Sequence, residues 1–204
     1  MKLSALILIP TISSLLVALS AAPKKPIMSW PPASETNYVD VDKFDLDPDL
    51  EITLWAKSPL FYNPTNMSID PKGRIWVTEG VNYREKLGIR RNAGDRIMVL
   101  IDADQDGKAD QSKVFLQDPY LESPLGISVF DNKIIISQPP DIVIYTDVNR
   151  DLKFDPKIDK KEILLTGFNG RQHDHSLHSI TSGPDGKWYF NSGNCGAIFT
   201  DNSG

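Results

Sequence analysis

Short apolar runs separated by turn-forming residues recur along the chain after residue 45. Twelve such runs are rich in Ile, Val, Phe, Tyr and Trp, and Gly, Pro, Asp or Asn bounds each of them. They are 50–56, 66–70, 74–79, 96–102, 113–117, 126–130, 133–138, 142–147, 161–167, 178–183, 187–192 and 196–201. No window of about 11 residues in this region keeps a helical period. The pattern predicts an all-β chain of short strands.

The runs repeat in two ways. Residues 66–80, NMSIDPKGRIWVTEG, resemble residues 179–193, SITSGPDGKWYFNSG, as a strand, a Pro-x-Gly turn and an aromatic strand. The stretch DADQDGKAD begins at Asp102, and the related stretch DVNRDLKFD begins 45 residues later at Asp147. About four strands in each 40–50 residues is the period of a β-propeller blade. A β-sandwich is the alternative, but a sandwich has no reason to repeat a loop at a fixed offset.

The repeats divide residues 46–204 into three predicted blades, 62–118, 119–168 and 169–204, the last without its fourth strand. The run 50–56 is then an outer strand that closes a ring against a blade from the other end. Because propellers need about four to eight blades, we expect an incomplete β-propeller, with about three blades of a six-bladed ring. We also expect the chain to be the N-terminal part of a longer protein.

The N-terminal residues have the pattern of an export signal. Lys2 precedes an apolar run, 3–19, and small residues follow at 18–22. We predict a signal peptide over residues 1–21 and a Pro-rich linker over residues 22–45, which implies a periplasmic or cell-surface protein. The alternative is a membrane anchor, although Pro10 interrupts the run and leaves it short of the ~18 apolar residues of a spanning helix. Contact with the membrane therefore stays open.

The net charge and the cysteine content bear on nucleic-acid binding and on disulfide formation. The formal net charge is −5 and no Lys/Arg-rich stripe occurs, so we do not expect a nucleic-acid partner. The single cysteine, Cys195, cannot form an internal disulfide and is expected to be a small apolar residue beside two glycines.

The first acidic stretch has the spacing of a calcium loop. Alternate carboxylates can converge on one hard cation, and Gly107 allows the sharp turn between them. The twelfth position, a glutamate in EF-hands, is Lys113, so we predict a weaker structural calcium loop between strands. The alternative is a solvated turn capped by Asp side chains. The predicted ligands are Asp102, Asp104, Asp106 and Asp110.

The second acidic stretch keeps the spacing with one change. Its predicted ligands are Asp147, Asn149, Asp151 and Asp155. Leu152 replaces the glycine, which strains the turn and makes calcium less favourable there.

All three histidines, His173, His175 and His178, fall within six residues. A strand period puts His173 and His175 on one face and His178 on the other. A His-x-His pair could hold a transition metal, but a third ligand from the same segment would require a bend. The other interpretations are a catalytic base, because imidazole suits proton transfer near neutral pH, and a structural inner strand.

Residues 174–196, DHSLHSITSGPDGKWYFNSGNCG, are similar to the segment of soluble quinoprotein glucose dehydrogenases that holds their catalytic histidine. The resemblance implies a six-bladed propeller with pyrroloquinoline quinone on its axis, His175 as the base for the sugar hydroxyl, and Asp174 as its neighbour. Asn194 stands where that family has an aspartate. Its amide oxygen can accept from the imidazole but cannot stabilise the imidazolium by charge.

Residues 44–204 as a whole resemble the propeller of large exported membrane-bound dehydrogenases of Planctomycetes and Verrucomicrobia. Those proteins often continue into helical repeats and a haem-binding Cys-x-x-Cys-His module. The resemblance implies oxidation of a sugar or alcohol with electrons passed to a quinone and then to a cytochrome. It also implies that haem belongs to a module beyond this chain. Calcium is the other expected cofactor, from the acidic loops, whereas the quinone and calcium ligands of the glucose dehydrogenases lie mostly in later blades.

Two other functions remain open. One is a non-catalytic propeller that binds carbohydrate or protein. The other is a calcium-dependent hydrolase of the lactonase type, which predicts metal-dependent hydrolysis and no reduction of an electron acceptor.

Overall fold

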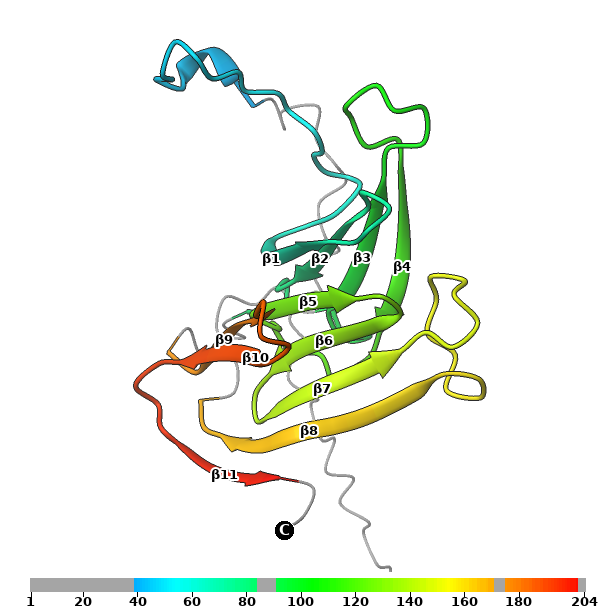
Figure 1. Ribbon diagram of the computed structural model, residues 1–204, viewed down its shortest axis with the longest axis vertical. Helices are drawn as coiled ribbons and strands as arrows, with labels where there is room; N and C mark the ends of the chain where they lie inside the picture. The colour runs from blue at the N-terminus through cyan, green and yellow to red at the C-terminus, as the bar shows by residue number, and fades with distance from the viewer. Residues whose placement is uncertain (1–38, 84–90, 171–174, 202–204) are drawn as a thin grey trace, which may run out of the picture.

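The computed structural model describes residues 39–83, 91–170 and 175–201 (Figure 1). The predicted signal peptide and residues 22–38 of the predicted linker lie outside the described residues. The remaining linker residues contain a short 3₁₀ turn, η1 (Val41–Lys43). Within the described ranges, no helix is both long and apolar enough to cross a membrane.

The described residues form an all-β structure of antiparallel sheets. The first sheet has the order β1-β2-β3-β4, with β1 (Pro64–Ile69), β2 (Ile75–Glu79), β3 (Arg96–Ile101) and β4 (Gln111–Gln117). The second sheet has the order β11-β8-β7-β6-β5, with β5 (Gly126–Phe130), β6 (Lys133–Gln138), β7 (Asp141–Thr146), β8 (Lys160–Phe168) and β11 (Ala197–Asp201). The third is a hairpin of β9 (Leu177–Ser182) and β10 (Trp188–Ser192).

The first and second sheets pack face to face. Side chains alternate between the two faces of a strand, so Trp76 and Val99, which pair across β2 and β3, share one face. They form a buried cluster with Ile136, Val143 and Tyr145 of the second sheet. This cluster joins the two sheets into one body.

The third sheet covers the other face of the second. Ile135 and Ile142 of the second sheet form a buried cluster with Leu177 and Ile180 of β9, and Trp188 packs against it. The second sheet is therefore covered on both faces, whereas a loop segment, 54–61, lies over the outer face of the first sheet.

Strands β1, β5 and β9 run side by side in the same direction (Figure 1). Asn66 Nδ2 donates to the Leu125 carbonyl at 3.1 Å, Val129 N donates to Ser68 Oγ at 3.1 Å, and Gly126 lies against the His178 carbonyl. As a result, the β2–β3, β4–β5, β6–β7, β8–β9 and β10–β11 connections gather at one end of the sheets, here named the connection end. The β3–β4 and β7–β8 loops lie at the opposite end, here named the acidic end.

Eleven of the twelve predicted runs are strands, and the first two predicted groups, 62–118 and 119–168, match β1–β4 and β5–β8. The third group, 169–204, differs, because β11 pairs with β8 instead of β10. Within the β5–β8 meander, the outer edge of the nine-residue β8 has no partner. β11 pairs with that edge. The run 50–56 is not a strand, because it lies in no ladder with a described strand.

Candidate functional site

The sequence-predicted base, His175, lies at the connection end, two residues before β9. Its carbonyl accepts from Cys195 N at 3.1 Å, and the neighbouring Ser176 carbonyl accepts from Gly193 N at 2.7 Å. A Cβ on Gly193 would meet the His175 carbonyl oxygen at 2.4 Å, so only glycine allows this approach. The β10–β11 turn is therefore fixed against the backbone of His175, with Asn194 between its two anchoring residues.

Ser176 holds the β8–β9 connection from the other side. It is fully buried, and its hydroxyl donates to the Asn169 carbonyl. His175 itself is exposed and so reachable by a small molecule. His178 is half-buried within β9, whereas Asp174 and His173 lie outside the described residues.

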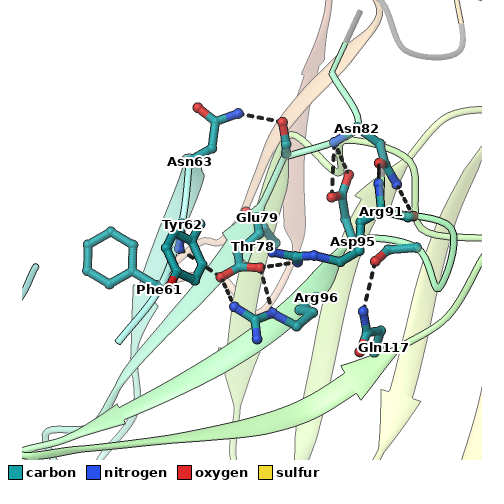
Figure 2. Close-up of polar contacts among 12 residues, drawn as sticks. Phe61, Tyr62, Asn63, Thr78, Glu79, Asn82, Arg91, Asp95, Arg96 and Gln117 are labelled. Carbon is teal, nitrogen blue, oxygen red and sulfur yellow. Dashed lines mark hydrogen bonds and ion pairs between the residues drawn. The ribbon is translucent and has the colours of Figure 1, made fainter. Parts of the chain in front are cut away.

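A buried ionic cluster sits at the same end, where β2 ends and β3 begins (Figure 2). The Glu79 carboxylate is fully buried. It accepts from Tyr62 N at 2.8 Å, from Arg91 Nη1 at 2.5 Å, and from Arg96 through Nε and Nη2, each at 2.7 Å. Four donors match the acceptor capacity of an ionised carboxylate. The cluster is therefore suited to holding chain segments together and not to transferring protons.

A second buried carboxylate, Asp95, ties the β2–β3 connection to the β4–β5 connection. Figure 2 shows its contact with Asn82. Asp95 accepts from Asn82 N at 3.1 Å and from Ser123 N at 2.7 Å. Desolvation raises the pKa of Asp95 to about 6, against the opposing effect of these N–H bonds and of the Arg91 charge. Its own N–H donates to the Leu121 carbonyl at 2.9 Å, so backbone and side chain hold the same two segments.

Asn82 closes the base of the β2–β3 connection. Its Nδ2 donates to the Arg91 carbonyl at 3.0 Å, and Arg91 N donates to Asn82 Oδ1 at 2.6 Å. Sequence reasoning missed this network. The signal was available in Glu79, a charge at the end of an apolar run, and in the charges of both signs in the RRNAGDR stretch that follows, 90–96.

At the acidic end, three of the four predicted ligands of the first loop come together. Carboxylate oxygens of Asp102, Asp104 and Asp106 lie within 4.8 Å of one another, and an all-oxygen set of this kind suits a hard cation such as calcium. Asp110 is not part of the group, because its carboxylate accepts from Ala103 N at 2.7 Å.

The three aspartate ligands predicted in the second loop, Asp147, Asp151 and Asp155, do not form a comparable group of carboxylates. Over the parts of the chain that the structure describes, the first loop holds the one group of three or more His, Cys, Asp or Glu whose ligand atoms could share a metal. The fourth predicted ligand, Asn149, lies beside Asp151, to which its Nδ2 donates at 2.9 Å. Asp155 N donates to Asp159, a buried carboxylate that the calcium pattern did not include, at 2.7 Å.

Comparison with known proteins places the chain in a family. No curated protein matches it. A family model described as a domain of unknown function, DUF7133, matches residues 38–203, which include every described strand and both ends of the sheets. The chain belongs to the DUF7133 family.

Proposed function

We propose that this chain is part of an exported β-propeller that oxidises a sugar or alcohol and passes the electrons to a quinone and then to a cytochrome. Two features of the fold support the propeller. Two consecutive four-stranded meanders, β1–β4 and β5–β8, pack face to face. Their first strands also lie side by side with β9, which is the arrangement of innermost strands around an axis.

The observation that carries the enzymatic proposal is the contact between His175 and the β10–β11 turn. An exposed imidazole beside a turn that is anchored by two backbone hydrogen bonds is accessible and held in place, as a general base must be. Asn194 lies in that turn and would orient the ring through its amide oxygen.

In the proposed reaction, His175 accepts the proton of the substrate hydroxyl while the adjacent C–H bond loses a hydride. Pyrroloquinoline quinone, when bound, would supply the hydride acceptor. None of the described residues is assigned to the quinone. Calcium held by Asp102, Asp104 and Asp106 would be structural, because these residues lie at the acidic end and His175 lies at the connection end.

The test is dye-linked oxidation of a panel of sugars and alcohols by the complete protein loaded with the quinone. We expect His175→Ala to lower the rate by about 10²- to 10⁴-fold, the usual contribution of a positioned base, with little change in the free energy of unfolding. His178→Ala is the matched control and should affect stability more than rate, because His178 is half-buried in β9. A His175→Ala protein with wild-type rates would refute the assignment of the base.

A further inference from the structure

The outer face of the first sheet is apolar and only partly covered. Cross-strand pairing aligns two rows of side chains on it, Met67–Val77–Met98–Val114 and Ile69–Ile75–Leu100. The segment 54–61 covers Val77, Met98 and Leu100, but Met67 and Ile69 remain 61% and 60% exposed. A continuous exposed apolar surface of this kind marks an interaction site.

A groove runs along this face between the sheet and the covering segment. Its walls are Trp55, Phe61, Pro64, Met67, Val77 and Leu100. The second sheet differs, because each of its faces packs against another sheet.

A repeated hydrogen bond identifies what the covering segment is. Phe154 N, in the second acidic loop, donates to the Phe115 carbonyl at 2.7 Å. Ala109 N donates to the Trp55 carbonyl at 2.8 Å, and Ala109 holds the same place in the first loop, 45 residues earlier. Phe115 lies on β4, the outermost strand of the first sheet. Trp55 therefore has the position of an outer-strand residue in a sheet that would precede the first.

We propose that residues 51–57 are the outermost strand of a further antiparallel sheet, whose three inner strands come from polypeptide outside residues 39–201. Three are needed because β1–β3 and β5–β7 each lie inside an outer strand in their own meanders. The inner strands pair with the free edge of residues 51–57 and pack an apolar face on Met67 and Ile69. This inference rests on the propeller part of the proposed function.

The direction of the Trp55 carbonyl also determines which backbone groups of residues 51–57 face the incoming strand. In an extended strand, the N–H and C=O groups of successive residues point to opposite edges. Because the Trp55 carbonyl faces Ala109, the N–H groups of Leu54 and Ala56 face the incoming strand. A second copy of this chain cannot supply the three inner strands, because its third sheet has two strands, β9 and β10.

The experiment places a photo-crosslinking benzoylphenylalanine at Met67 in the protein as isolated from the cells that make it, and identifies the crosslinked peptide by mass spectrometry. We expect a peptide from outside residues 39–201 that contains short runs of alternating apolar residues. Amide exchange at Leu54 and Ala56 should be at least ~100-fold slower in the crosslinked species than in the 204-residue chain alone, because ladder amides are protected. The control position is Ile158, a 50% exposed residue in the second acidic loop.

Two results would overturn the proposal. One is a crosslink from position 67 to residues 177–201 of a second copy, and the other is a yield at position 67 no greater than at position 158. Unprotected amides at Leu54 and Ala56 in a crosslinked species would refute the strand pairing. If the crosslink and the protection are found but the protein oxidises no sugar or alcohol, the enzymatic proposal fails and the docking surface stands.

Discussion

The two acidic loops have the same backbone conformation but differ in their side-chain contacts. In the first, the Asp102 carboxylate accepts from Asp106 N at 3.2 Å and from Gly107 N at 3.0 Å. In the second, Asp147 accepts from the two residues at the same offsets, Asp151 and Leu152, at the same two distances. Positive φ angles also recur at the same places, 64° at Gln105 and 60° at Arg150.

The difference lies in the side chains. The first loop is largely exposed, and three carboxylates face one another. In the second, Leu152 is 8% exposed within the main core cluster, and Phe154 packs edge-on against Phe115 and Tyr145. The same turn can therefore be held by an apolar anchor in one copy and can offer a cation site in the other.

The largest effect should come from removing the apolar anchor. Leu152→Ala keeps the positive φ of the site and deletes buried methyl groups, so we expect a loss of about 2–4 kcal/mol in the free energy of unfolding. Urea denaturation measures it. A loss well below about 1 kcal/mol would mean that the core does not hold the second loop.

Calcium should stabilise the protein through the first loop alone. At ten times its dissociation constant, calcium adds about 1.4 kcal/mol, seen as a higher melting temperature in calcium than in chelator. Asp104→Ala should abolish the difference, and Asn149→Ala, the matching change in the second loop, should leave it intact. Equal melting temperatures with and without calcium in the wild-type protein would exclude the site.

Exchanging the residue at either turn position should destabilise the protein, but for different physical reasons. Gly107 has φ +88° and nothing within 4 Å of an added Cβ, so Gly107→Ala should cost about 1 kcal/mol from backbone strain alone. Leu152→Gly relieves strain at φ 68° but loses core packing, so it should still destabilise. Chemical denaturation of both variants distinguishes strain from packing, and a stabilising Leu152→Gly would reverse the comparison.

The smallest effect concerns an ion pair of the second loop. Arg150 bonds to both oxygens of Asp131, at 2.7 and 2.6 Å, and this lowers the pKa of the Asp131 carboxyl. The pair therefore stabilises the fold above the usual Asp pKa and loses that contribution as pH falls through the lowered value. Arg150→Ala should return the pKa of Asp131 toward its ordinary range in an NMR titration. Both side chains are exposed, so salt should weaken the effect, and an unchanged titration would show that the pair does not form in solution.

The strands could be predicted from sequence because alternation and turn residues are local. The run 50–56 has the same composition as the true strands, yet it forms none, because a strand also needs a partner edge. The local sequence pattern also does not determine which strand pairs with the edge of a sheet. For this reason β11 was expected in the third group, whereas it pairs with β8.

The candidate sites could be predicted in part for the same reason. The spacing from Asp102 to Asp106 is enough to bring three carboxylates together, since five residues form the turn. It does not show that Asp110 and Asp159 turn to backbone N–H groups. The roles of Glu79 and Asp95 depend on donors that the fold brings from other segments, such as Tyr62 and Ser123.

The hydrogen bond from Ala109 to Trp55 has a consequence for the order in which the chain folds during synthesis. It joins residues 54 positions apart, so at about 5–20 residues per second the Trp55 segment waits roughly 3–11 s for its partner. Strands β1 and β2 need only a turn of a few residues and can pair as soon as they emerge. The Trp55 segment is thus secured after β1 and β2, although it precedes both in the sequence, and its apolar side chains are open to proteases and to misassembly in the interval.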